Sequence, residues 1–307
     1  VDIEHGTRAV LAALCTGDTV AAEVSLAELE NLLETAGGTA VATVVQNMDK
    51  PNPKTYIGSG KALEIAKLVE TDGDISLVVF DNELSPSQIA NLEELIGVRV
   101  IDRTMLILDI FALHAVTGEG KLQVEIACLR YTAPRLTGKG KELSRLGGGI
   151  GTRGPGESKL ESDRRHLRRR IAALEEELAE MERTRRTQRA ARDKKSIKNS
   201  AIVGYTNSGK STLLNHLTAA GILAENKLFA TLDPTTRLLT TENGVEVLLT
   251  DTVGFIDRLP HHLVKAFKST LDELKYADII IHLTDGSECV EEIQRKAAVT
   301  DSLIEEL

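Results

Sequence analysis

The chain has 307 residues, 42% of them hydrophobic, which is enough for two or three packed domains and argues against a disordered protein. Its three cysteines lie far apart, which argues against a zinc site or a disulfide framework. No apolar run reaches the roughly 20 residues of a membrane span, so we expect a cytoplasmic protein without one. The net charge is −9, but residues 130–198 hold 20 Lys and Arg against 10 Asp and Glu, which indicates a polyanionic partner.

Residues 1–103 alternate apolar runs with segments of helical spacing. The runs predict strands at residues 10–14, 40–45, 77–80 and 98–101. The helical spacing predicts helices at residues 26–33, 62–69 and 89–96. Ser85 and Pro86 together are typical of a helix N-terminus. This alternation predicts an N-terminal parallel α/β domain, and we find no catalytic group of residues in it.

Residues 104–197 change to the pattern of long helices. Two heptad-like apolar seams are present, one at Leu122, Ile126, Leu129 and Ala133, the other at Leu160, Leu167, Ile171, Leu174, Leu178 and Met181. Two seams separated by a loop predict a long antiparallel helical hairpin, in which each helix buries its stripe on the other.

The loop between the seams, residues 137–156, has eight glycines in 20 residues. Glycines permit close approach to an RNA backbone, and cations neutralise its phosphates. We therefore predict RNA binding by Lys139, Lys141, Arg145 and Arg153. The alternative is a linker between domains.

Residues 204–211 read GYTNSGKS, a Gly-x-x-x-x-Gly-Lys-Ser phosphate-binding loop. A short apolar run precedes it and a helical pattern follows it, as that loop requires. Its backbone N–H groups and Lys210 would contact the phosphates, while the Ser211 hydroxyl would bind Mg²⁺. Residues 198–307 are thus predicted to bind a nucleoside triphosphate.

The segments after the loop resemble those of Ras-like GTPases. Residues 229–237 read FATLDPTTR, a predicted hairpin turns at Asn243–Gly244, and its second strand ends in DTVG at 251–254. By this resemblance Asp251 would hold Mg²⁺ through water and the Gly254 N–H would sense the γ-phosphate. The residues alone leave Thr231, Thr235 and Thr236 open as the switch threonine.

Phe255 stands where Ras-like enzymes usually have a glutamine that orients the attacking water. A phenyl ring cannot do this by hydrogen bonding, so we expect slow intrinsic hydrolysis unless a partner, another residue or a cation assists. Asn207 resembles the asparagine that coordinates potassium in cation-activated relatives, which suggests K⁺ as an additional cofactor.

The whole chain resembles the HflX family of ribosome-associated GTPases. The motifs that carry the resemblance are IGSGK at 57–61, LDIFA at 108–112, GKLQVE at 120–125, the run from Pro134 to Glu157, GYTNSGKSTLLN, FATLDPTTR and DTVGFI. The resemblance implies an α/β domain (1–103), a helical arm (104–197) and a Ras-like P-loop GTPase domain (198–307). It further implies a Mg²⁺-dependent GTPase that binds GTP, GDP and the rRNA of the large (50S) ribosomal subunit, in ribosome splitting, rescue or biogenesis. It favours Thr231 as the switch threonine.

With this resemblance the catalytic residues are expected to be Lys210, Thr231 and Gly254, and the metal ligands Ser211, Thr231 and, through water, Asp251. The nucleotide-binding residues are expected to be Gly204, Tyr205, Thr206, Asn207, Ser208, Gly209, Lys210, Ser211, Phe229, Ala230, Thr231, Leu232, Asp233, Asp251, Thr252, Val253 and Gly254.

No Asn-Lys-x-Asp guanine motif follows Asp251, and Asn226–Lys227 precedes the switch and lacks the aspartate. We therefore expect a GTPase domain that is C-terminally incomplete, with guanine preference implied by the family alone. Two alternatives remain: an ATP-using or promiscuous RNA-remodelling NTPase, and an RNA-binding module with a vestigial nucleotide site. A monomer is expected.

Overall fold

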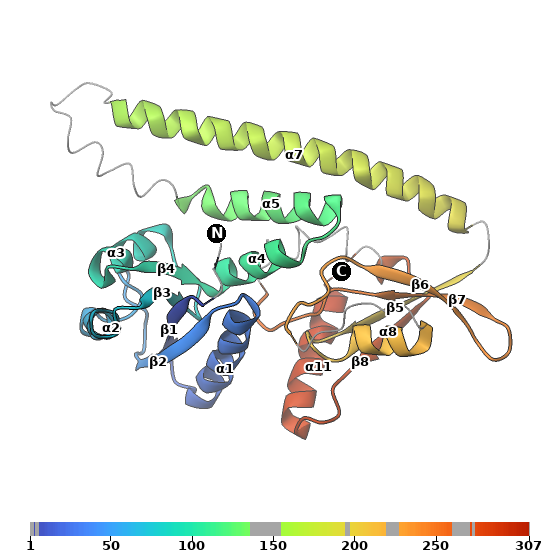
Figure 1. Cartoon of the computed structure of the whole chain (residues 1–307), viewed down its shortest axis with the longest axis horizontal. Helices are drawn as coiled ribbons and strands as arrows, with labels where there is room; N and C mark the ends of the chain where they lie inside the picture. Colours follow the sequence, from blue (N-terminus) through green and yellow to red (C-terminus); the bar gives the residue numbers. More distant parts are fainter. Residues whose placement is uncertain are drawn as a thin grey trace. The chain divides into compact units, whose positions relative to one another are not determined.

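The computed structural model describes residues 3, 6–135, 155–193, 197–218, 227–259, 271 and 274–306 (Figure 1). The four loop cations Lys139, Lys141, Arg145 and Arg153 lie outside these residues. The chain forms two compact units, one made of Val1–Ile110 and Cys128–Ala173, the other of Phe111–Ala127 and Leu174–Leu307.

The first unit contains a four-stranded sheet in which every strand pair is parallel. Its strands are β1 (Arg8–Cys15), β2 (Thr39–Asn47), β3 (Ile75–Phe80) and β4 (Arg99–Asp102), in the order β2-β1-β3-β4. The intervening helices are α1 (Thr19–Thr35), α2 (Ser59–Asp72) and α3 (Pro86–Ile96). The predicted parallel α/β arrangement is confirmed.

Local sequence explains where these elements begin and what they bury. The Gln88 N–H donates to Ser85 Oγ at 3.3 Å and the Ser85 N–H donates to Gln88 Oε1 at 2.9 Å, a reciprocal cap that starts α3. Pro86 follows at the first helical position, as predicted. The core lies between sheet and helices and includes Val10, Val78, Phe80, Ile65 and Leu92.

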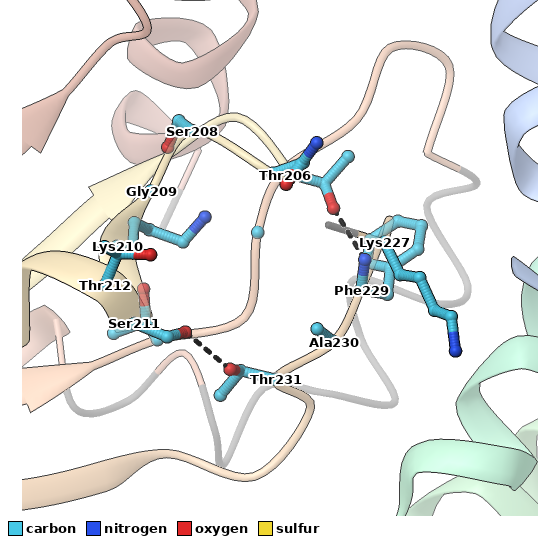
Figure 2. A pocket seen from close by; sticks show the side chains of 13 residues that line it. Thr206, Ser208, Gly209, Lys210, Ser211, Thr212, Lys227, Phe229, Ala230 and Thr231 are labelled. Carbon is cyan, nitrogen blue, oxygen red and sulfur yellow. Dashed lines mark hydrogen bonds between the residues drawn. The ribbon is translucent and has the colours of Figure 1, made fainter. Parts of the chain in front are cut away.

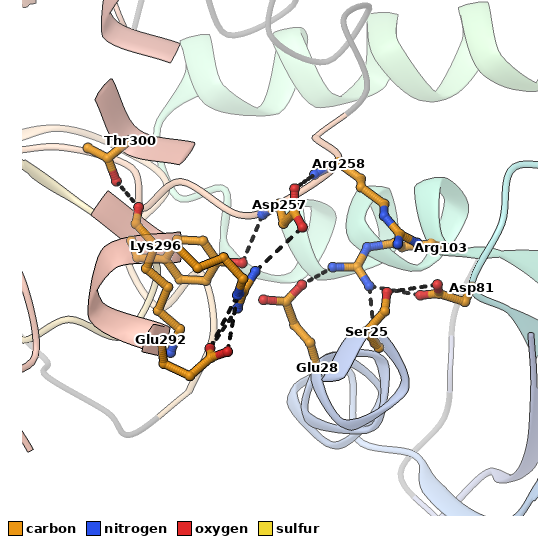
Figure 3. A network of polar contacts seen from close by, with 11 residues as sticks. Ser25, Glu28, Asp81, Arg103, Asp257, Arg258, Glu292, Lys296 and Thr300 are labelled. Atoms are coloured by element: carbon orange, nitrogen blue, oxygen red, sulfur yellow. Dashed lines mark hydrogen bonds and ion pairs between the residues drawn. The ribbon is translucent and has the colours of Figure 1, made fainter. Parts of the chain in front are cut away.

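Charged residues at the end of β4 are buried and paired. Figure 3 shows Arg103 with Asp81, Glu28 and Ser25; the Arg103 Nη1 lies 2.9 Å from Asp81 Oδ1. Asp102 accepts hydrogen bonds from the Leu84 N–H, the Met105 N–H and the Tyr131 hydroxyl. These contacts join helices to the sheet, so the acidic residues here have a structural role.

The middle of the chain is helical, as predicted. It comprises α4 (Arg103–His114), α5 (Gly118–Thr132) and α7 (Pro155–Asp193). Arg185, late in α7, forms an ion pair with Glu119 at the start of α5. The seam residues Leu122, Ile126 and Leu174 are buried. Leu167, on the predicted seam of α7, is half-buried.

The second unit contains a four-stranded sheet ordered β6-β7-β5-β8. Its elements are β5 (Lys198–Gly204), α8 (Lys210–Thr218), β6 (Thr235–Thr240), β7 (Glu246–Asp251), β8 (Ile279–Leu283) and α11 (Val290–Glu305). Strands β6 and β7 are antiparallel and the other pairs are parallel. The predicted hairpin is therefore present, with Gly244 at a φ of 76° in its turn. Among the described helices, none has the length and apolar character that crossing a membrane requires.

Candidate nucleotide-binding site

The loop from Gly204 to Lys210 joins the end of β5 to the start of α8. A Cβ at Gly204 would lie 2.2 Å from the Leu283 carbonyl oxygen on β8, so no larger residue fits there. Asn207 has a φ of 60°, a left-handed conformation that asparagine tolerates better than most residues. The chain is thereby turned so that the N-terminal end of α8 faces the space that this loop encloses.

A pocket lies against this loop (Figure 2). Its lining residues are Thr206, Asn207, Ser208, Gly209, Lys210, Ser211, Thr212, Lys227, Phe229, Ala230, Thr231, Thr252 and Gly254. The phosphate-binding loop, the 229–231 segment and the 252–254 segment thus meet at one place.

Lys210 is buried beneath the loop. Its ammonium group donates to the Tyr205 carbonyl at 2.8 Å and lies 3.3 Å from the Gly204 carbonyl. Burial lowers the pKa of Lys210 to about 8, and the neighbouring Asp251 opposes that shift. A phosphate beside this group would favour its charged form, because an opposite charge replaces weak carbonyl partners.

Ser211, Thr231 and Asp251 form a connected polar group beside Lys210. The Ser211 hydroxyl donates to Asp251 Oδ2 at 2.6 Å, and the Thr231 hydroxyl lies 2.8 Å from Ser211 Oγ (Figure 2). Burial raises the pKa of Asp251, while its hydrogen bond from Ser211 lowers it. Thr236 lies within β6, with its hydroxyl 2.9 Å from that of Thr250. Of the three candidate threonines, the structure brings Thr231 to Ser211.

These oxygen atoms fit a hard cation such as Mg²⁺. The Oδ1 atom of Asp251 is buried and has no hydrogen-bond partner among the described residues. The described residues contain no cluster of three His, Cys, Asp or Glu that could hold a metal. A cation here would need the hydroxyls and additional oxygens from water or a phosphate, as is usual for magnesium bound with a nucleotide.

The 252–255 segment is fixed against the phosphate-binding loop. The Thr206 N–H donates to the Phe255 carbonyl at 2.6 Å, and the Phe255 N–H donates to the Gly204 carbonyl at 3.1 Å. A Cβ at Gly254 would lie 2.5 Å from Thr206 Cα, so the close approach requires glycine. The Phe255 ring is buried.

Three family models match successive parts of the chain. The model described as GTP-binding GTPase N-terminal matches residues 23–112, the GTP-binding GTPase Middle Region matches 114–192, and the 50S ribosome-binding GTPase matches 199–306. The GTPase HflX of Caldanaerobacter subterraneus subsp. tengcongensis is 52% identical over 300 residues, which are 98% of this chain and 69% of that protein. The chain belongs to the HflX family of GTPases.

Two other GTPases of the HflX family also match most of the chain. GTPase HflX of Lacrimispora saccharolytica is 58% identical over 280 residues, or 91% of this chain, and that of Escherichia coli is 47% identical over 282 residues, or 92%. Each of these alignments covers 66% of the relative, so the chain spans about two thirds of the length of these curated relatives.

Solved structures agree with the fold. A GTP-binding protein from the archaeon Sulfolobus solfataricus in complex with GDP matches 98% of this chain and 78% of its own, with a TM-score of 0.52 and 28% identity. A complex of SsGBP and GDP covers the same shares with a TM-score of 0.55 and 27% identity. The predicted class, an α/β domain, a helical middle region and a P-loop GTPase domain, is thus confirmed.

Not every residue predicted from HflX motifs lines the pocket. Gly204, Tyr205, Leu232, Asp233, Asp251 and Val253 are absent from the lining. Gly204 instead permits the tight turn of the loop, and Asp251 accepts a hydrogen bond from the lining residue Ser211. Asp233 instead receives hydrogen bonds from the Val116 and Thr117 N–H groups.

Two lining residues were not predicted from sequence. Thr212 lies in the first turn of α8, and its position directly after the motif serine was a sufficient signal to include it. Lys227 precedes the 229–237 segment, and no motif marks it.

Proposed function

We propose that the protein to which this HflX-family chain belongs binds GTP and GDP, hydrolyses GTP, and associates with the 50S ribosomal subunit. The observation that carries the proposal is the convergence of Lys210, Ser211 and Thr231, backed by Asp251, on one pocket at the start of α8. The model described as 50S ribosome-binding GTPase over residues 199–306 supports the ribosomal partner. A monomer acting in the cytoplasm, in ribosome splitting, rescue or biogenesis, is consistent with that partner.

Magnesium is the proposed cofactor. The hydroxyls of Ser211 and Thr231 would ligate it, and Asp251 would hold it through water, for which the buried Oδ1 offers an acceptor. When bound, the ion neutralises charge on the phosphate oxygens. Lys210 adds a positive charge, and the Gly254 N–H lies in the segment beside it, so both are proposed to contact the terminal phosphate.

Slow intrinsic hydrolysis follows from Phe255, whose buried ring offers no hydrogen bond to an attacking water. A partner or a cation would have to supply that function. Asn207 lines the pocket in a left-handed conformation, and we infer that its side chain helps to bind K⁺. Turnover should then be faster in potassium than in sodium buffer, and the difference should disappear in Asn207→Ala. Equal turnover in both buffers, with and without ribosomal subunits, would remove potassium from the scheme.

Competition binding on the full-length protein tests the proposal. GTP and GDP should displace a fluorescent guanine nucleotide in a magnesium-dependent manner, whereas ATP should compete poorly. The Lys210→Ala substitution should abolish nucleotide binding. Equal competition by ATP would favour the promiscuous RNA-remodelling NTPase. Ribosome association that does not depend on nucleotide and is unchanged by Lys210→Ala would favour an RNA-binding module with a vestigial nucleotide site.

A further inference from the structure

Asp233 of the 229–237 segment holds the N-terminus of α5. The Val116 and Thr117 N–H groups each donate to Asp233 Oδ2 at 2.8 Å, and the Thr117 hydroxyl donates to Oδ1. Thr117 Oγ1 also accepts from the Gly120 N–H at 2.9 Å, which makes Thr117 the N-cap of this helix. The carboxylate thus meets the positive end of the helix dipole and three hydrogen-bond donors.

The contact is closely packed as well as polar. A Cβ at Gly120 would lie 2.4 Å from Asp233 Oδ1, so the first turn of α5 has no room for a side chain on that side. These residues are more than 100 positions apart in sequence, yet they belong to one compact unit.

Phe229 packs against α4, the helix that precedes α5. Its ring meets that of Phe111 on α4 edge to face, with centroids 4.7 Å apart and planes at 81°. Both rings are buried, and the Phe229 N–H donates to Thr206 Oγ1 at 2.7 Å. Phe229 has a φ of 56°, which is uncommon for an aromatic residue and persists only when its surroundings hold it.

Thr231 lies midway between these two attachments. Two residues of extended chain span at most about 7 Å, so fixing Phe229 and Asp233 leaves Thr231 little freedom. Between them its hydroxyl lies 2.8 Å from Ser211 Oγ. Among the described residues, neither α4 nor α5 supplies a residue to the pocket lining, whereas the segment that both helices contact does.

We propose that Phe111, Thr117 and Asp233 are positioning residues, through which the junction of α4 and α5 places Thr231 at the cation site. This inference rests on the proposed function, since it assumes that Thr231 contacts the magnesium of a bound triphosphate. Displacing the junction weakens binding of magnesium triphosphate, and by thermodynamic reciprocity triphosphate binding stabilises the N-terminus of α5. A partner that moves the helices would thereby reach the nucleotide site.

The test uses full-length Asp233→Ala and Thr117→Val, with Thr117→Ser restoring the hydroxyl. The matched control is Asp18→Ala, which removes a comparable cap, the Ala21 N–H to Asp18 Oδ1 bond of 3.0 Å at α1. Asp233→Ala and Thr117→Val should each lower the affinity for a non-hydrolysable GTP analogue with Mg²⁺ about tenfold or more. Their affinity for GDP should stay within about twofold of wild type. Thr117→Ser and Asp18→Ala should match wild type.

A second measurement follows hydrogen exchange of the Val116 and Thr117 amides. The GTP analogue, but not GDP, should slow their exchange about tenfold in wild type, and Thr231→Ala should abolish that effect. If the variants lose affinity for the GTP analogue and for GDP equally, or lose affinity for neither, the positioning role is overturned. If wild type shows no magnesium-dependent preference for the triphosphate, the proposed function fails and this inference with it.

Discussion

Gly254 lies so close to the phosphate-binding loop that a methyl group there would collide with it. The added Cβ would be 2.5 Å from Thr206 Cα and 3.0 Å from Lys210 Nζ. The first neighbour is backbone and cannot move aside cheaply, so either the loop or the 252–254 segment must shift. Single residues therefore control how the phosphate-binding groups are arranged.

Gly254→Ala should lower GTP turnover about 100-fold, because displacements near 1 Å at a reacting group have effects of that size. Single-turnover hydrolysis measures it. Gly286→Ala is the matched control, since a Cβ at Gly286 would meet nothing within 4 Å, and it should behave as wild type. Unchanged turnover in Gly254→Ala would show that the segment is not held as closely as the structure has it.

At the scale of elements, the end of β4 is joined to α1 and β3 by a buried ion-pair group. Arg103 is 4% exposed and Asp81 3%, whereas Arg8 and Asp72 form a pair that is 42% and 31% exposed. Removing one partner of a buried pair leaves the other charge desolvated without compensation, while an exposed pair is largely screened by water.

Arg103→Met should therefore destabilise the first unit by about 3–5 kcal/mol. Arg8→Met should cost about 0–1 kcal/mol. Urea denaturation followed by circular dichroism compares the two midpoints. Similar midpoints for both variants would mean that the Arg103 group contributes no more than a surface pair.

The elements themselves could be predicted because their signals are local. Alternating apolar runs located β1 to β4, and Ser85 with Pro86 located the start of α3. The choice among three threonines could not be made from spacing, since it depends on β6 beginning at Thr235 and turning Thr236 toward Thr250. The contact of Asp233 with Thr117 has no local signal at all, because the two residues meet only in the folded chain.

At the scale of the whole molecule, the proposed binding of ribosomal RNA depends on cations outside the described residues. Replacing Lys139, Lys141, Arg145 and Arg153 by alanine should weaken 50S binding and reduce the slope of log affinity against log salt by about 3. The exposed Lys50, Lys54, Lys67 and Arg99 provide a charge-matched control whose replacement should change the slope little. Identical slopes for the two variants would refute the assignment of the glycine-rich loop as the RNA contact.

The central claim is that a magnesium-bound triphosphate orders the segments around Thr231 and Gly254 and so controls ribosome binding. Co-sedimentation of the full-length protein with purified 50S subunits tests this most directly, with a non-hydrolysable GTP analogue, GDP or no nucleotide. The account predicts strong pelleting with the analogue, weak pelleting otherwise, and no nucleotide dependence in Lys210→Ala. Equal pelleting of the wild-type protein under all three conditions would contradict it.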